Sequence, residues 1–114
     1  MSDLKHVVDQ ITAAFDSRDL DGFAKFLKDD FVWLRSNGTT FIEGKEAFLK
    51  EVVDYWQANP DVKSQLSEPI VIGNMVAQGE KTTGNADGSD DEYLWVYEFD
   101  GHMLAKQWGF QPAK

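Results

Sequence analysis

EYLWVYEFDGHMLAKQWGF, residues 92 to 110, is the stretch of sequence that decides the fold. Asp100-Gly101 separates two apolar runs, and this dipeptide predicts a β-hairpin because glycine accepts the positive φ that a tight turn requires. Alternate side chains of a strand point to opposite faces. One face of the first strand therefore carries four aromatic residues: Tyr93, Trp95, Tyr97 and Phe99. The other face carries Leu94 and Val96, so we expect a central strand that is covered on both sides.

The composition is typical of a folded protein. Of 114 residues, 42% are hydrophobic and 27% are charged, and a chain of this length can bury one core without a metal ion or a disulfide. We therefore expect a single domain over residues 1–114. Aromatic residues make up 13% of the chain. They indicate either a cavity lined by rings or an ordinary aromatic core, because aromatic side chains dominate many cores.

Charge and cysteine content exclude several classes of protein. The net charge of −9 would repel a phosphate backbone, so a nucleic-acid partner is not expected. The absence of cysteine excludes disulfides and thiolate chemistry and fits a reducing cytoplasm. The N-terminus lacks the apolar core of a signal peptide, and no apolar run is long enough to cross a bilayer. We expect a cytoplasmic protein without a membrane partner.

Three segments have the apolar spacing of amphipathic helices. The first follows Ser2 or Asp3, either of which can act as N-cap, and runs over residues 4–15. The second follows Asp19 and covers residues 20–27, and the third begins after Gly44 and ends before the Asn59-Pro60 pair.

The remaining segments have the composition of strands. Beside the hairpin, the predicted strands are residues 31–35, 41–42, 62–66, 70–72 and 75–83. Pro69 indicates a kink, a bulge or a sheet edge between two of them. Helices come early and an antiparallel sheet follows, which predicts an α+β fold.

Four short motifs carry a family resemblance through their joint order. They are DLDGF (residues 19–23), DDFVW (29–33), GKEAF (44–48) and WVYEFDG (95–101). In this order the chain resembles the nuclear transport factor 2-like superfamily, with the SnoaL-like and ketosteroid-isomerase-like branch closest in pattern. The resemblance implies a cystatin-like α+β cone, in which a strongly curved mixed or antiparallel sheet wraps around three N-terminal helices. It also implies an apolar pocket at the open end and a homodimer through the convex face of the sheet.

The acid and base groups of ketosteroid isomerases are not found at the matching positions. Aligned through the shared motifs, their tyrosine, base and acid positions fall on Ile11, Arg35 and Trp95. A guanidinium cannot abstract a proton, and neither isoleucine nor indole replaces an acid that holds an oxyanion. SnoaL-type cyclases are similar in using an aspartate of the last strand, and residues 102–110 contain no carboxylate. Whether the chain is an enzyme therefore stays open.

We expect the ligand-binding pocket to be lined by residues that alternate toward the inside of the cone. They are Trp33, Arg35, Trp56, Trp95, Tyr97, Trp108 and Phe110. Arg35 is the one cation of this set and either anchors the carboxylate of a flat ligand or forms a salt bridge at the rim.

Other ionisable residues are weaker candidates for a site. We expect neither His6 nor His102 to be catalytic, and we expect Glu80 and Glu98 to face solvent or the dimer interface. The acidic segment 87–92 lacks the ligand spacing of a calcium loop, so neither a metal ion nor a cofactor is expected.

Three functional hypotheses follow from the sequence. The first is a protein that binds a hydrophobic or aromatic small molecule, with an acidic ligand as one option, in an aromatic-lined pocket with no assigned reaction. The second is an isomerase, dehydratase or polyketide-cyclase-like enzyme with a relocated acid or base, such as Tyr97 or a glutamate. The third is a non-catalytic dimeric interaction module whose cone is filled by its own side chains.

Overall fold

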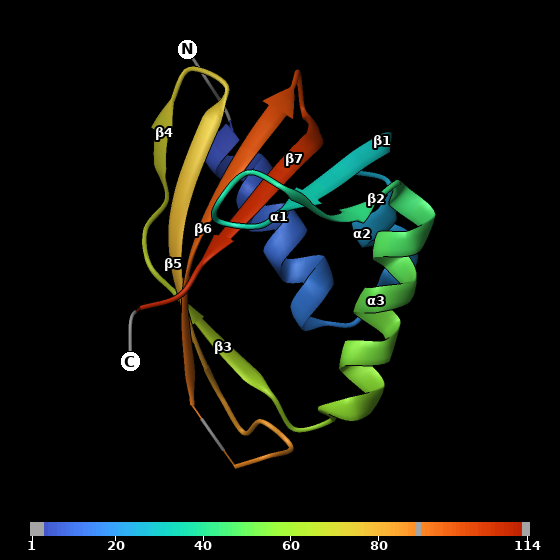
Figure 1. The fold of residues 1–114 in the computed structure, drawn as a ribbon, viewed down its shortest axis with the longest axis vertical. Coiled ribbons are helices and arrows are strands. Elements are labelled where there is room, and N and C mark those ends of the chain that lie inside the picture. The colour runs from blue at the N-terminus through green and yellow to red at the C-terminus, as the bar shows by residue number, and fades with distance from the viewer. Residues whose placement is uncertain (1–3, 89, 113–114) are drawn as a thin grey trace.

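Three helices and a seven-stranded mixed sheet make up the described part of the chain, residues 4–88 and 90–112 of a computed structural model (Figure 1). The elements are α1 (Leu4–Asp16), α2 (Leu20–Ala24), β1 (Leu27–Leu34), β2 (Thr40–Glu43), α3 (Lys45–Ala58), β3 (Lys63–Leu66), β4 (Ile70–Ile72), β5 (Met75–Thr83), β6 (Asp91–Asp100) and β7 (Met103–Phe110). The predicted α+β class is confirmed. The proposed caps Ser2 and Asp3 lie outside the described residues.

The sheet has the strand order β2-β1-β7-β6-β5-β3, with β4 also paired to β5. β1 and β7 run parallel, and the other neighbours run antiparallel. The predicted hairpin is confirmed as β6 and β7: Asp100 pairs with Met103, and Gly101 has a φ of 61° at the turn. The hairpin therefore lies at the centre of the sheet, as its two apolar faces indicate.

The second helix is shorter than predicted, and the first strand begins earlier. α2 ends at Ala24, and β1 already starts at Leu27, which is buried and pairs with Leu104 of β7. The amide of Leu104 also donates to the carbonyl of Phe26 at 2.7 Å. Pairing with β7 therefore overrides the helical spacing of residues 25–27, and the polar residues Lys28 and Asp30 become the outward positions of a strand.

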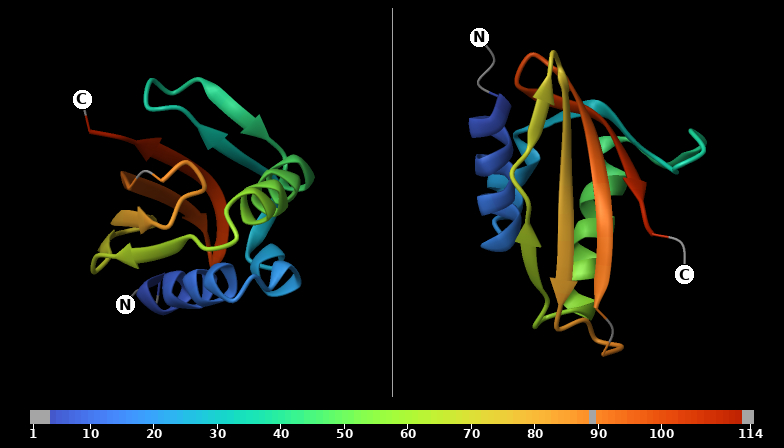
Figure 2. Two further views of the ribbon diagram at one scale, coloured as in Figure 1. Left: turned by 90° about the horizontal axis from the view of Figure 1, so that it is seen from below. Right: turned by 90° about the vertical axis from the view of Figure 1, so that its left-hand side faces the viewer.

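Both long helices lie against the concave side of the sheet, which bends around them (Figure 2). The core is centred on Phe31, which is completely buried and has its ring centroid 4.5 Å from that of Phe48 on α3. Val7 and Val8 of α1 are buried in the same cluster. Among the described residues, no helix is long and apolar enough to cross a membrane.

Arg18 fixes the end of α3 to the corner between α1 and α2. Its guanidinium donates to the carbonyls of Trp56 at 2.8 Å, Asn59 at 3.2 Å and Pro60 at 3.1 Å. These carbonyls belong to the last turn of α3 and the residues after it, where the helix dipole is negative and a cation is favourable. Arg18 itself has a φ of 58°, an uncommon conformation for a residue other than glycine, which its three hydrogen bonds stabilise.

Candidate functional site

A cavity of about 460 Å³ lies between the helices and the concave face of the sheet. Aromatic residues from all three helices and from the sheet make up nine of its 19 described lining residues. They are Phe15, Phe23, Trp33, Phe41, Phe48, Tyr55, Tyr93, Trp95 and Tyr97. The cone is thus hollow in this structure and is not filled by its own side chains. The sequence-predicted residues Trp33, Trp95 and Tyr97 all line this space.

Strand register places the sheet residues of the cavity in rows. Tyr97 of β6 pairs with Val76 of β5 on one side and with Gln107 of β7 on the other, and Gln107 pairs with Trp33 of β1. Paired residues of neighbouring strands point to the same face. One row therefore crosses the wall from β5 to β1, and the next row, two residues along, contains Trp95.

The indole of Trp95 is held in place from three directions. Its Nε1–H donates to Oε1 of Glu80 at 2.9 Å, and its ring stacks on Tyr93 with centroids 5.1 Å apart and planes 19° apart. The Trp33 ring meets it at 5.7 Å in an edge-on arrangement. The ring also lies across Gly109 of β7, whose missing Cβ leaves the space. Such contacts preorganise an aromatic wall, because a rigid ring loses little entropy when a ligand binds.

Glu80 was expected to face solvent or the dimer interface, and this prediction is wrong. It lies on the concave face of β5 opposite Tyr93 and lines the cavity. The alternating inward residues of this strand are Val76, Gln78, Glu80 and Thr82. Val76 alone is apolar among them, so hydrophobic alternation does not reveal which face of β5 is inside.

Two further polar groups of the concave face have no hydrogen-bond partner among the described residues. Gln107 lines the cavity and is only 8% exposed, and its side-chain amide makes no hydrogen bond within the described part of the chain. The phenol of Tyr97 lines the same space. Its pKa is well above the ordinary value, mainly because the phenol is buried and to a lesser extent because the Glu80 carboxylate is nearby. The phenol therefore stays a protonated donor at neutral pH. Both groups line the cavity without a protein partner among the described residues, so they are available to a ligand.

Arg35 does not reach the cavity. Its Nη1 donates to the carbonyl of Thr40 at 2.7 Å, and its guanidinium lies over the Phe41 ring at 5.2 Å. Phe41 lines the mouth of the cavity, and Arg35 is exposed on the far side of that ring. The guanidinium is therefore held within the β1–β2 hairpin, and its proposed role as an anchor for an acidic ligand loses its geometric basis.

Trp56 was also expected in the pocket and is instead part of the core. It is buried on α3 with its ring centroid 5.4 Å from that of Phe15. Its Nε1 has no hydrogen-bond partner among the described residues. Phe15 connects Trp56 to the cavity, since it packs against the core that contains Trp56 and also lines the cavity.

Trp108 and Phe110 face the opposite side of the sheet. They pair with Val96 and Leu94 of β6, which alternate with the inward aromatic residues. The reason is a bulge in β7: Leu104 pairs with Phe99, but Glu98 pairs with Lys106, which leaves Ala105 as an extra residue. In a regular strand the even-numbered residues would share the inward face of buried Leu104. Beyond the bulge the odd-numbered ones do, and Gln107 and Gly109 face the cavity.

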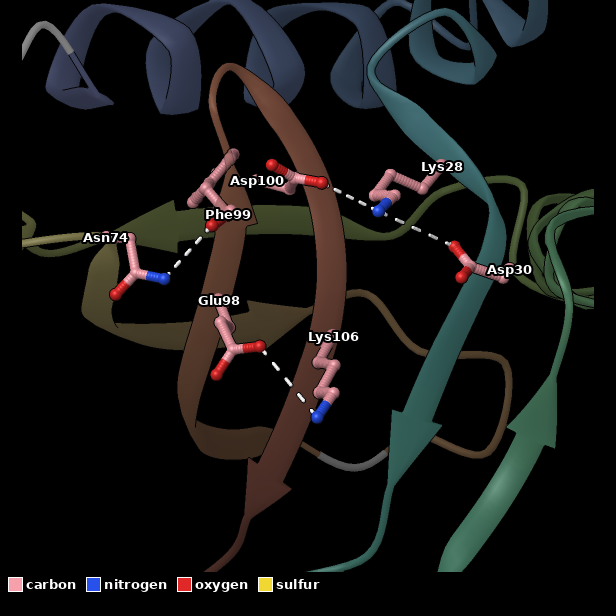
Figure 3. Close-up of polar contacts among 7 residues, drawn as sticks. All are labelled: Lys28, Asp30, Asn74, Glu98, Phe99, Asp100 and Lys106. Atoms are coloured by element: carbon pink, nitrogen blue, oxygen red, sulfur yellow. Dashed lines mark hydrogen bonds and ion pairs between the residues drawn. The ribbon is translucent and has the colours of Figure 1, made fainter.

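A polar hollow on the outer face connects β1 with the β6–β7 turn (Figure 3). Lys28 Nζ lies 2.7 Å from a carboxylate oxygen of Asp100 and 4.0 Å from one of Asp30. The charge of Lys28 holds the pKa of Asp100 below its ordinary value. Lys106 and Glu98 form a looser pair at 3.9 Å. Both lysines are engaged by carboxylates, so we interpret these ion pairs as links between neighbouring strands rather than as a ligand site.

The residues that matched the isomerase positions fall in different places. Ile11 and Trp95 line the cavity, whereas Arg35 lies outside it. His6 is exposed on α1 and His102 on the β6–β7 turn, and neither lines the cavity. In residues 4–88 and 90–112, no group of three histidine or carboxylate side chains is placed to hold a metal ion.

Comparison with known proteins gives one family match and many similar folds. The model of the SnoaL-like domain family matches residues 8–106. A cystatin-fold protein from Novosphingobium aromaticivorans, itself described as uncharacterized, has a TM-score of 0.85 at 20% identity over 97% of this chain and 100% of its own. An NTF2-like protein of unknown function from Burkholderia pseudomallei has a TM-score of 0.78 at 18% identity over 98% and 92% of the two chains.

A third similar structure is that of TerC. TerC, co-crystallized with polyporic acid, has a TM-score of 0.79 at 13% identity over 97% of this chain and 92% of its own. At these identities the likeness shows the fold alone. A search of the curated proteins finds no match.

The close contact between Trp95 and Gly109 gives a direct test of the wall. In Gly109→Ala the new Cβ would lie 2.7 Å from Cζ3 of Trp95, so we expect the indole to move and its hydrogen bond to Glu80 to weaken. The measurement is the Nε1–H resonance of Trp95 in a ¹⁵N–¹H spectrum, assigned by its absence in Trp95→Phe. Gly79→Ala on the outer face is the control, and an unchanged resonance in Gly109→Ala would contradict this geometry.

Proposed function

The chain belongs to the SnoaL-like domain family, and from this we propose that it binds a hydrophobic or aromatic small molecule in the cavity between its helices and the concave face of its sheet. The observation that carries the proposal is the open aromatic cavity with the unpaired amide of Gln107 and the phenol of Tyr97 at its wall. A volume of about 460 Å³ falls within the range of small-molecule sites. Rings supply most of the contact area, and a few polar groups orient the ligand.

The outer face of the central strands supports a homodimer as part of the same proposal. Bulge geometry gathers Leu94, Val96, Trp108 and Phe110 on that face, and Leu94 is 47% exposed. A contiguous apolar patch of this kind is usual for an interface between subunits and unusual for a monomer. The lack of cysteine fits a cytoplasmic location, which we include in the proposal.

Replacing one of two tryptophans on the same sheet tests the binding site. We expect Trp95→Ala to weaken binding of the neutral fluorescent probe N-phenyl-1-naphthylamine by about tenfold, because the stacked wall at Tyr93 and Trp33 is lost. Trp108→Ala on the outer face should leave the affinity nearly unchanged. Probe fluorescence at equilibrium is the measurement, with circular dichroism to check the fold. Equal effects of the two substitutions, or no binding by the wild type, would contradict the proposal.

A charge on the outer face tests the dimer. Leu94→Lys places a cation in the centre of the apolar patch, and we expect the protein to sediment as a monomer while its fold is retained. Sedimentation velocity at several protein concentrations gives the association state. Lys81→Leu, a substitution of an exposed residue on the same sheet, should leave the dimer intact. A monomeric wild type at high concentration would end the dimer proposal and leave the cavity untouched.

An isomerase-type enzyme is the second candidate, and the position of Glu80 favours it. A carboxylate inside the cavity can remove a proton next to a carbonyl group while the Tyr97 phenol donates a hydrogen bond to the carbonyl oxygen. The proton then returns from Glu80 to the substrate, so the step needs no oxidant or further reactant. Glu80 would be the relocated base of the family pattern.

Hydrogen–deuterium exchange distinguishes this enzyme from a simple binding protein. For the second candidate we expect the wild type to accelerate exchange at the α-carbon of 2-tetralone in D₂O, followed by NMR. Glu80→Gln should reduce the acceleration by about a hundredfold or more, as loss of a general base does, while probe binding persists. An exchange rate equal to that in buffer would contradict the enzyme candidate and leave ligand binding as the proposed function.

A further inference from the structure

We propose that the ligand of this cavity carries an organic cation, such as an arylalkyl amine or a quaternary ammonium group, which Glu80 and the surrounding rings recognise together. The inference rests on the proposed binding function and names the class of ligand that the site selects. It follows from the charges, the rings and the unpaired polar groups that surround one volume.

Every ionised side chain among the described cavity-lining residues is a carboxylate. Glu80 comes from β5, Asp16 from the end of α1 and Glu51 from α3, so acidic groups approach the space from three elements. No lysine, arginine or histidine is present among the described lining residues. Arg18 is the cation that acts on the nearby Tyr55, and its guanidinium is engaged by three carbonyls at the end of α3. The cavity therefore lacks an internal counter-charge for Glu80.

Glu80 also keeps part of its hydrogen-bonding capacity free. One oxygen accepts from Trp95 Nε1 at 2.9 Å, and no donor reaches its second oxygen among the described residues. A carboxylate has room for several donors, and an ammonium group supplies two or three. Charge-assisted hydrogen bonds of this kind are stronger than neutral ones, and the apolar wall reduces their screening by water.

The rings next to Glu80 suit a cation rather than an anion. Trp95 meets Glu80 through its N–H edge and stacks on Tyr93, the register partner of Glu80, and Trp33 meets Trp95 edge-on. The face of an aromatic ring is electron-rich and attracts a cation within about 6 Å of its centre. The rings next to Glu80 therefore add a weaker attraction for a cation to that of the carboxylate itself.

Gln107 and Tyr97 supply acceptors as well as donors two rows of the wall away from Glu80, with the row of Trp95 between them. The side-chain amide of Gln107, a residue that is 8% exposed, lines the cavity and makes no hydrogen bond within the described part of the chain. The phenol oxygen of Tyr97 can also accept a hydrogen bond while it stays protonated. Glu80 of β5 pairs with Tyr93, four residues before Tyr97 on β6, so these neutral acceptors lie farther along the same cavity wall from the charged one.

An acidic ligand, which the sequence allowed as an option through Arg35, meets the opposite conditions. Its carboxylate would approach three carboxylates, and Arg35 is held over Phe41 outside the cavity. The protein as a whole has a net charge of −9, which attracts cations and repels anions at a distance. Local and global charge therefore favour the same class of ligand.

Three naphthalene compounds of similar size test the inference: 1-naphthylmethylammonium, 1-naphthylmethanol and 1-naphthoate. Titration calorimetry of the full chain at pH 7 and low salt measures their affinities. We expect the ammonium compound to bind at least about tenfold more tightly than the alcohol, and the carboxylate to bind least. Raising the salt concentration should weaken binding of the ammonium compound and leave the alcohol unchanged.

Glu80→Gln keeps an acceptor for Trp95 and removes the charge. We expect it to reduce the preference for the ammonium compound, measured as the ratio of the ammonium and alcohol affinities of the same variant, to about twofold or less. Glu92→Gln makes the same charge change on the outward face of β6, where Glu92 pairs with Lys81, and should keep the preference. Glu51→Gln, at an exposed position of the cavity mouth, should reduce the preference partly and serves as the second variant if Glu80→Gln does not fold.

The outcomes separate this inference from the binding function itself. If the alcohol or the carboxylate binds as tightly as the ammonium compound, the cation inference is overturned and the cavity remains a binding site. The same holds if N-phenyl-1-naphthylamine binds and none of the three compounds does. If no compound binds at all, the proposed function fails as well. A preference that persists in Glu80→Gln would overturn the role of Glu80.

Discussion

The extra residue in β7, Ala105, is the constraint on which the site depends. It shifts the register between β6 and β7, so that Gln107 and Gly109 face the concave side and Trp108 turns away from it. Gly109 then leaves room for the Trp95 indole, and the indole reaches Glu80 on β5. One bulge thus determines both the composition of the cavity wall and the apolar surface on the outer face.

The hydrogen bond between Trp95 and Glu80 links the architecture to the chemistry. It joins neighbouring strands on the diagonal of a cross-strand pair, where long side chains still reach each other. It orients an indole whose ring belongs to the wall and holds the carboxylate of Glu80, which lines the same cavity. The site therefore combines an apolar surface with one positioned charge, an arrangement that selects ligands by both shape and sign.

The fold and about half of the cavity wall could be predicted from the sequence, because they depend on local turn residues and on the regular alternation of side chains along a strand. Asp100-Gly101 marks the hairpin, and alternation in β6 puts Trp95 and Tyr97 on one face. The bulge at Ala105 leaves no such signal, since nothing in its residue type separates it from a regular strand position. Alternation on β5 fails for a different reason: Glu80 shares its face with glutamine and threonine, so burial there depends on the strands beside it. Arg35 is held by a neighbouring hairpin carbonyl, a contact that sequence spacing does not reveal.

The hydrogen bonds of Arg18 affect how the cavity can accept ligands of different size. The Arg18 guanidinium links the C-terminal end of α3 to the corner between α1 and α2. We therefore expect this end of the cavity to change little in shape. At the other side Phe41 stands 47% exposed on a hairpin joined to the rest of the sheet by β1 alone. We therefore expect a bulkier ligand to displace the β1–β2 hairpin before it displaces the end of α3.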